Sequence, residues 1–323
     1  MPASAQFSRL PSSTVLELLT DWLGFANLRI RPRTQHDYAG LIRRYVADTP
    51  LAVRPLVDLE PGDLQHPISQ LAVAGHVIAA RHLYVLLRQA FKWAMKARKV
   101  SWNPMDAVSP PRLPRRTQAV FTRDQALKLI AEAPSDPLGN LWITMLGTGV
   151  RVGEALALKW SDLEGEVLSV QRNLVELPGR GNPALFGEPK SASGFRQIVL
   201  PEVVGAALGR QRDLATQRRR EAGRRWREHD LVFPTCVGTP HNSGNIRARW
   251  KRFCLRAGLP PVRLYTTRHT CATLLLASGE NPKAIAEVLG HANVVMLLQV
   301  YAHPLAEDRR RIAATLGKAL SAT

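Results

Sequence analysis

The carboxy-terminal stretch RHTCATLLLASGENPKAIAEVLGHANVVMLLQVYAH, residues 268–303, is the most informative part of this chain. Arg268 enters an otherwise apolar helical segment, where a charged side chain needs a partner or a ligand. The Asn-Pro pair that follows predicts the start of a second helix. Gly290 predicts its end, because glycine readily adopts a left-handed cap. His291 comes directly after that cap, and a third helix is predicted to carry Tyr301. The stretch therefore predicts three helices with three candidate site residues.

Two more candidates lie upstream. Arg151 stands in TGVRVGEALAL (148–158), three residues before Glu154, at the predicted start of a helix. Residues three apart share a helix face, so Glu154 can orient the guanidinium, although an ordinary surface ion pair is the alternative. Lys190, in EPKSASGFRQIVLP (188–201), comes just before a predicted strand. A lysine at such a turn is ordinarily a solvated charge, so position alone does not assign it a function.

The order of these elements is more specific than any one of them. Arg268 alone could form a structural buried pair, His291 could be a capping donor, and Tyr301 could be a half-buried aromatic residue. Together, two guanidiniums, a lysine, an imidazole and a phenol can hold a phosphodiester and attack it with tyrosine. In this order the chain resembles the tyrosine recombinase family of phage integrases and Xer-like two-domain enzymes. The resemblance covers residues 12–315, with its specific motifs in 148–304.

The resemblance implies a role for each residue. Arg151 and Arg268 would grip the non-bridging oxygens of the scissile phosphate, for which a planar guanidinium that stays protonated is well suited. His291 would add a further hydrogen bond and help to stabilise the charge of the transition state. Tyr301 would be the nucleophile that forms a covalent 3′-phosphotyrosine. Lys190 would be the general acid that protonates the departing 5′-oxygen.

Two more residues complete the implied site. Glu154 would support Arg151 without touching the substrate. Tyr265 stands three residues before the second arginine, where the family most often has histidine. A phenol is a poorer proton shuttle at neutral pH than an imidazole. We therefore expect Tyr265 to position the substrate rather than to act as a general base.

Charge is the strongest bulk signal. The 323 residues contain 44 Lys+Arg and 26 Asp+Glu, a net charge of +18. Such an excess favours a polyanionic partner, most commonly nucleic acid. A ribosomal-type structural protein and a protein that binds a membrane surface are the alternatives. No apolar run approaches the roughly 18–20 residues that span a bilayer, and no secretory signal is visible. Three cysteines fit a reduced compartment, so we expect a cytoplasmic, nucleoid-associated protein.

No cofactor or metal is expected. A phosphotyrosine link keeps the energy of the phosphodiester, so the implied reaction needs no ATP, and the chain has no phosphate-binding G-x-x-x-x-G-K-[ST] loop. Its histidines and cysteines do not fall into a convincing zinc spacing.

The predicted fold is mainly α. A helical amino-terminal core-DNA-binding domain (12–104) is followed by a basic linker (105–120). The mixed, mostly α catalytic domain (121–323) has a small antiparallel β-sheet. Capping boxes predict helix starts at Thr14 and Thr122, and Thr34 is expected to cap another helix.

Further helices and strands complete this prediction. A short helix is expected after Glu60-Pro61 and a long one over 76–99, with an apolar stripe on one face and basic residues on the other. Strands are predicted in 166–177 and 195–201, and basic helices over 206–230 and 245–257.

We therefore predict a site-specific recombinase that acts on double-stranded DNA, by resemblance as a homotetramer on two sites. The tail DRRRIAATLGKAL (308–320) would be a helix that docks on a neighbouring protomer. Because the segment before Thr14 is short, we expect no additional arm-binding domain. A type IB topoisomerase and a non-catalytic DNA-binding remnant of a mobile element are the alternatives, and the GENP segment could also belong to a helix-turn-helix. Integration, excision, dimer resolution and inversion share this chemistry.

Overall fold

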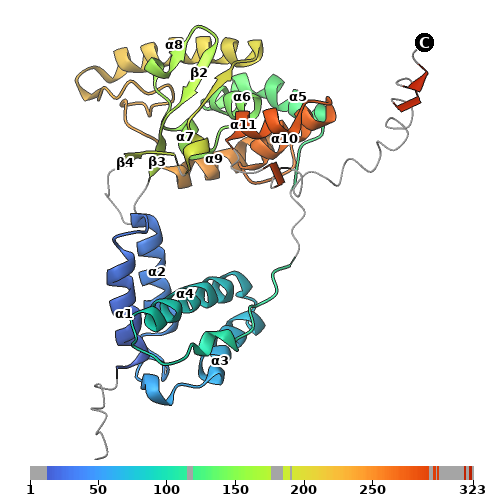
Figure 1. The fold of residues 1–323 in the computed structure, drawn as a ribbon. Coiled ribbons are helices and arrows are strands. Elements are labelled where there is room, and N and C mark those ends of the chain that lie inside the picture. Colours follow the sequence, from blue (N-terminus) through green and yellow to red (C-terminus); the bar gives the residue numbers. More distant parts are fainter. Residues whose placement is uncertain are drawn as a thin grey trace, which may run out of the picture. The chain divides into compact units, whose positions relative to one another are not determined.

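The computed structural model describes residues 13–114, 119–175, 185–189, 191–290, 294–295, 297, 316–317 and 320–321. These residues form two compact units, the first up to residue 114 and the second from residue 119 onward (Figure 1). The first unit is helical, and the second combines helices with small antiparallel sheets, as the predicted fold class requires.

The first unit is built around a long helix. Its elements are α1 (Val15–Ala26), α2 (Pro32–Tyr45), α3 (Pro61–Val73), α4 (Val77–Lys96) and short 3-10 helices at Leu56–Asp58 and Pro104–Asp106. Helix α4 contacts α1, α2 and α3. The predicted apolar stripe of α4 is buried in full and forms the centre of the core; it consists of Leu83, Leu86, Leu87, Ala90, Phe91 and Ala94.

Local capping signals explain where α1 and α2 begin. The predicted box at Thr14 is present, because the Thr14 backbone N–H donates to Glu17 Oε2 at 2.8 Å and the Thr14 hydroxyl accepts from the Glu17 backbone. The predicted cap at Thr34 is wrong. Helix α2 starts at Pro32, since a proline at the first helical position loses no hydrogen bond and already has the helical φ.

The end of the first unit also differs in detail from the sequence pattern. Helix α4 ends at Lys96, and Arg98 adopts a left-handed φ of 54°, so the helix stops before Asn103-Pro104. Met105 and Val108 are buried in the core of this unit. The first residues of the segment predicted as a linker therefore pack as part of the helical unit.

The second unit contains α5 (Arg123–Glu132), α6 (Gly139–Thr148), α7 (Val152–Ala155), α8 (Glu202–Ala222), α9 (Ser243–Arg256), α10 (Thr266–Ala277) and α11 (Pro282–Leu289). One antiparallel sheet has the order β1 (Leu163–Glu164), β2 (Val167–Val170), β5 (Arg196–Val199), and a second pairs β3 (Asn173–Val175) with β4 (Leu185–Gly187). In the first sheet Val170 faces Arg196 across the ladder.

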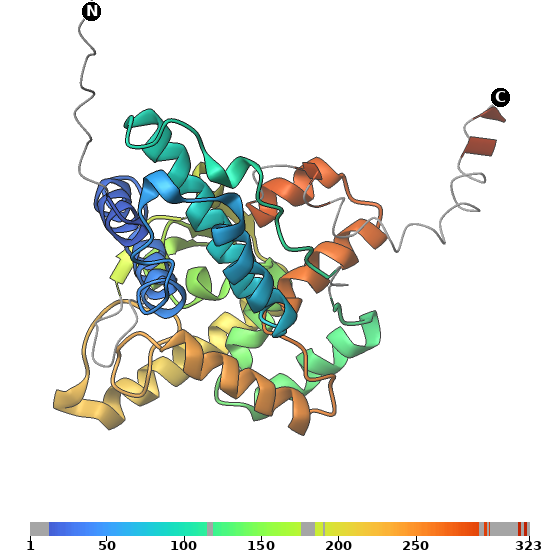
Figure 2. The ribbon, with the colours of Figure 1, turned by 90° about the horizontal axis from the view of Figure 1, so that it is seen from below.

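Helix α6 is the centre of this unit. It is apolar almost all round and contacts both α8 and α10. Its Trp142 lies edge-on to Trp250 of α9, with ring centroids 5.2 Å apart. Helices α10 and α11 pair with each other at the red end of the colour scale (Figure 2). The predicted capping box of Thr122 with Gln125 is present at the start of α5.

Two predicted elements are wrong in extent. The single strand expected over 166–177 is divided between β2 and β3, which pair in different sheets. The helix expected over 206–230 runs instead from Glu202 to Ala222, because Pro201 precedes it and Gly223 leaves the helical conformation with a φ of 51°. Most of the predicted tyrosine-carrying helix and of the 308–320 tail lies outside the described residues.

Candidate active site

Arg268 is a buried cation with unused donors. Its side chain is 1% exposed inside α10, and Nη1 donates to the Gly149 carbonyl at 2.7 Å. Nε and Nη2 are also buried, yet neither has a hydrogen-bond partner in the part of the chain that the structure describes. Burial, and then the charge of Arg151, lower the pKa of Arg268 to about 10, so it remains protonated at neutral pH. An anion with two oxygens would satisfy both donors.

Gly149 makes the contact with Arg268 possible. It ends α6 in the left-handed conformation, with a φ of +63°. A Cβ added there would lie 2.3 Å from Leu289 Cδ2 and 3.3 Å from Cys271 Sγ. Glycine therefore lets the end of α6 approach α10 and α11 closely, which brings the loop that carries Arg151 to Arg268.

Arg151 lies in that loop as the residue before α7. Its Nη1 donates to Glu154 Oε1 at 2.7 Å, and its Nη2 donates to the Gly290 carbonyl at 3.0 Å. The contact expected from the three-residue spacing is therefore present, and Glu154 is buried rather than part of a surface pair. The Arg151 side chain is 29% exposed, so it remains accessible to a ligand.

Glu154 has a second cationic partner that the sequence reasoning missed. Arg196 Nη2 donates to Glu154 Oε2 at 2.9 Å, and the Arg196 side chain is only 5% exposed. Burial would raise the pKa of Glu154, but the charge of Arg196 and the hydrogen bonds from Arg196 and Arg151 outweigh it and lower the pKa. Strand alternation could have found this residue, since Arg196 is two before the buried Ile198 and so shares its face.

The site carries an excess of positive charge. Arg151 and Arg196 each act electrostatically on Arg268, and in the described part of the chain Glu154 is the carboxylate that pairs with Arg151 and Arg196. Three guanidiniums against one carboxylate leave a cationic centre, and Arg151 and Arg268 retain capacity for an anionic ligand.

Tyr265 stands at the edge of the site. It precedes α10, is 43% exposed, and its ring lies edge-on to His269 with centroids 4.8 Å apart. Burial, and then the charge of Arg268, lower the pKa of His269 to about 4. His269 is therefore neutral at physiological pH and does not replace the histidine missing at position 265 as a cation.

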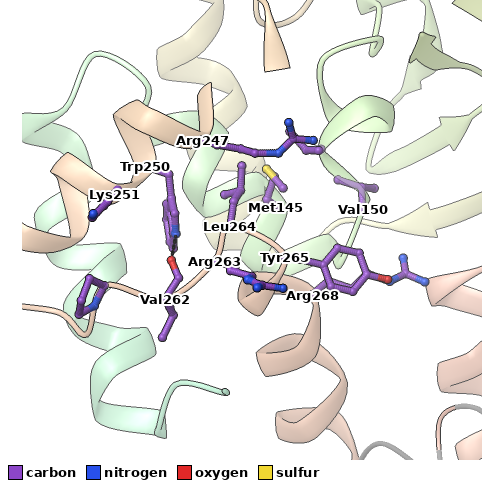
Figure 3. Close-up of a pocket in the computed structure, with 12 residues that line it drawn as sticks. Met145, Val150, Arg247, Trp250, Lys251, Val262, Arg263, Leu264, Tyr265 and Arg268 are labelled. Atoms are coloured by element: carbon purple, nitrogen blue, oxygen red, sulfur yellow. Dashed lines mark hydrogen bonds between the residues drawn. The ribbon is translucent and has the colours of Figure 1, made fainter. Parts of the chain in front are cut away.

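A pocket of about 500 Å³ opens beside Tyr265 and Arg268 (Figure 3). Its apolar walls come from α6 and the loop after it, from α9 and from the segment before α10, and include Met145, Val150, Trp250 and Leu264. Its cationic side chains are Arg247, Lys251 and Arg263, and Trp250 is held in place by a 2.9 Å hydrogen bond to the Val262 carbonyl. A cationic pocket next to an arginine with unused donors suits a polyanionic ligand.

Three predicted site residues, Lys190, His291 and Tyr301, lie outside the described residues. Direct neighbours of Lys190 and of His291 are described. Pro189 and Ser191 flank Lys190, and Gly290, whose carbonyl accepts from Arg151, precedes His291. Within the described ranges, no group of three or more His, Cys, Asp or Glu side chains could hold a metal ion, and no helix could cross a membrane.

The model of the phage integrase family matches residues 119–308, which include all of these site residues. The chain belongs to the phage integrase family. It is therefore a tyrosine recombinase, an enzyme that transfers DNA strands in site-specific recombination, as the sequence motifs predicted. Neither alternative, a type IB topoisomerase or a non-catalytic DNA-binding remnant, is favoured by the similarity to known proteins.

Three similar proteins illustrate the family. The tyrosine recombinase XerC-like protein of Caldanaerobacter subterraneus subsp. tengcongensis is 27% identical over 94% of this chain and 82% of its own length. The integrase of the Tn1549 transposon, solved in complex with a circular intermediate DNA, has a TM-score of 0.77 at 22% identity, over 94% of this chain and all of that one. A lambda integrase tetramer bound to a Holliday junction has a TM-score of 0.68 at 20% identity, over 90% of this chain and 78% of that one. At these identities the two structures show the shared fold.

Proposed function

We propose that this enzyme cuts and rejoins double-stranded DNA through a covalent 3′-phosphotyrosine on Tyr301, with Arg151 and Arg268 holding the scissile phosphate. One observation carries the proposal. Arg268 is buried, protonated and within electrostatic reach of Arg151, yet two of its donors lack a partner in the described chain. A phosphodiester has two non-bridging oxygens that such donors fit.

The reaction is balanced without a cofactor. The Tyr301 phenol gives its proton to water as its oxygen attacks phosphorus, the bond from phosphorus to the 5′-oxygen breaks, and Lys190 supplies the proton that this oxygen takes up. In the second step a 5′-hydroxyl attacks the phosphotyrosine and the phenol leaves, so the phosphodiester count is unchanged. Arg151, Arg268 and His291 stabilise the charge that builds on the phosphate oxygens in both steps.

Glu154 and Tyr265 have supporting roles in this proposal. Glu154 is buried and holds the Arg151 guanidinium through Nη1, which leaves Nη2 on the Gly290 carbonyl. Tyr265 is exposed beside the pocket and offers a phenol that can donate or accept a hydrogen bond. We assign Tyr265 to substrate positioning, since a phenol is a poor proton shuttle at neutral pH and its neighbour His269 is neutral there.

The two units would have different functions, one in DNA binding and the other in catalysis. We assign residues 12–104 to a core-DNA-binding domain, 121–323 to the catalytic domain and 105–120 to a basic linker, whose first residues pack on the helical unit. The net charge of +18 supports extensive phosphate contacts and predicts that DNA affinity falls steeply with salt. The tetramer that lambda integrase forms on a Holliday junction supports a homotetramer on two DNA sites, with the 308–320 tail between protomers. Such an enzyme would work in the cytoplasm, at the nucleoid.

The proposal is tested with nicked duplexes that tile the DNA flanking its gene. A nick beside the cut site lets the short 5′-product diffuse away, so the covalent adduct accumulates and survives denaturing electrophoresis. Wild type and Tyr265→Phe should form the adduct, whereas Tyr301→Phe should form none. Tyr265→Phe is the matched control because it also removes a single phenolic hydroxyl, in this case one beside the pocket.

Three results would overturn the proposal. An adduct that persists in Tyr301→Phe would assign the nucleophile elsewhere. Binding without any adduct, on every duplex of the set, would instead show a DNA-binding protein without strand transfer. Relaxation of supercoiled plasmid at no preferred sequence would show topoisomerase activity rather than site-specific recombination.

A further inference from the structure

Arg196 lies where three segments of the candidate site meet. We propose that Arg196 is a positioning residue for recombination. It connects the buried carboxylate of Glu154 with residues 191–194, which follow Lys190 (the Lys190 turn), and with residues 288–290, which precede His291 (the His291 segment). This inference rests on the proposed function, because it assigns to Lys190 and His291 the roles described above.

Each of the three nitrogens of the Arg196 guanidinium donates a hydrogen bond to a different segment. Nη2 donates to Glu154 Oε2 at 2.9 Å, in α7. Nε donates to the Val288 carbonyl at 2.6 Å, near the end of α11 and three residues before His291. Nη1 donates to the Gly194 carbonyl at 3.0 Å, in the turn that follows Lys190. A single buried side chain therefore connects the neighbourhoods of three site residues.

The Lys190 turn is packed directly against the segment before His291. A Cβ added at Gly290 would lie 2.7 Å from the Ser193 carbonyl oxygen and 3.0 Å from Arg196 Nη1. Within the turn, the Gly194 backbone N–H donates to the Ser191 carbonyl at 2.8 Å, so the residues after Lys190 form a closed 3-10 turn. A displacement of Arg196 would therefore be transmitted to both sides of this contact.

Glu154 shares its two oxygens between the two arginines. Oε1 accepts from the Arg151 side chain, and Oε2 accepts from the Arg151 backbone and from Arg196. Loss of Arg196 would leave a buried carboxylate with a single cationic partner, and such a group moves toward water or toward its remaining cation. Arg196 thus also restrains the arginine that would hold the phosphate.

Only arginine can make these contacts together. Its planar guanidinium presents donors in fixed and different directions, whereas lysine has one ammonium group on a flexible stem. Arg196→Lys keeps the charge beside Glu154 but cannot reach the carbonyls of Gly194 and Val288 at the same time. The substitution therefore separates the positioning role from the charge.

The experiment compares the single-turnover rate of adduct formation at saturating DNA on two nicked duplexes. One has the natural 5′-oxygen at the cut site, and the other has sulfur in its place. A thiolate leaves without being protonated, so the sulfur duplex does not depend on the general acid. Arg172→Lys is the matched control, since Arg172 binds the buried carboxylate of Asp162 in the same unit but forms no ion pair with Glu154 among the described residues.

Arg196→Lys should form the adduct about 100-fold more slowly than wild type on the oxygen duplex, because a misplaced catalytic group has an effect of that order. Its DNA affinity should stay near that of wild type, and the sulfur duplex should restore part of the rate, because it bypasses only the contribution of Lys190. Arg172→Lys should match wild type on both duplexes. Gly194→Ala gives an independent test if Arg196→Lys does not fold, because the added Cβ would lie 2.4 Å from Pro189 Cβ and shift the turn alone. Gly194→Ala should also form the adduct more slowly on the oxygen duplex and recover rate on the sulfur duplex.

Three results would overturn the inference: a rate for Arg196→Lys equal to that of Arg172→Lys, a loss confined to DNA affinity, or an equal loss on both duplexes. Each differs from failure of the proposed function, in which wild type itself would form no adduct that depends on Tyr301.

Discussion

Gly149→Ala is the substitution for which the structure makes the most specific prediction. Gly149 has a left-handed φ of +63°, and its added Cβ would lie 2.3 Å from Leu289 Cδ2 and 3.3 Å from Cys271 Sγ. Alanine would therefore be strained in its backbone and would also displace the last residue of α11. Leu289 is buried, so it has no solvent-filled space to move into.

The expected destabilisation has two parts. A non-glycine residue in the left-handed region costs roughly 1–2 kcal/mol. Forcing an extra methyl group into a packed core costs about 1–3 kcal/mol more. Gly149→Ala should thus lower the free energy of unfolding by about 2–5 kcal/mol. Gly165→Ala is the matched control, because its φ is +57° but no atom lies within 4 Å of the added Cβ. It should lose only the backbone part.

Urea unfolding of the full chain, followed by tryptophan fluorescence, measures the difference, since Trp142 and Trp250 lie in the core of this unit. Adduct formation gives a second measurement. Displacement of Leu289 moves Gly290, whose carbonyl holds Arg151, so Gly149→Ala should also cleave more slowly than Gly165→Ala. Equal stability and equal cleavage rates for the two variants would refute the argument that Gly149 is required for the approach of α6 to α11.

Three further predictions concern other contacts of the second unit. Arg268→Lys should form the adduct at least about 100-fold more slowly, because one ammonium group replaces several fixed donors, whereas Arg263→Lys on the exposed pocket rim should stay close to wild type in the same assay. Thr122→Ala removes a capping box and should lower the free energy of unfolding in urea by about 1 kcal/mol; an unchanged midpoint would contradict this. Burial and the charge of Arg268 lower the pKa of His269 from 6.5 to about 4. Between pH 6.5 and about pH 4, His269 therefore binds a proton in the unfolded chain but not in the folded chain. Stability should therefore fall as pH falls through this window, and His269→Asn should make the urea midpoint less dependent on pH there.

The sequence was sufficient for most of the helices because their signals are local. The capping boxes at Thr14 and Thr122 and the Asn-Pro start of α11 depend on residues within one turn of each other, and all three are present. The errors arose where competing local signals were close in strength. Thr34 was a plausible cap, but Pro32 begins α2 two residues earlier. The apolar pattern of 166–177 did not show that β2 and β3 pair with different strands.

The sequence by itself determined the family and the reaction, because the order of Arg151, Lys190, Arg268, His291 and Tyr301 is specific even though each residue is not. Tertiary structure alone decided how the described groups are held. The Gly149 carbonyl accepts from one nitrogen of Arg268, and two other nitrogens have no partner among the described residues, a result that depends on a contact across more than a hundred residues. Arg196 joins the site for the same reason: two of its hydrogen bonds reach Val288 and Glu154, which lie 92 and 42 residues away in sequence. Motifs record which residue types are present, whereas unused donors and shared carboxylates exist only once packing has brought distant segments within hydrogen-bond distance.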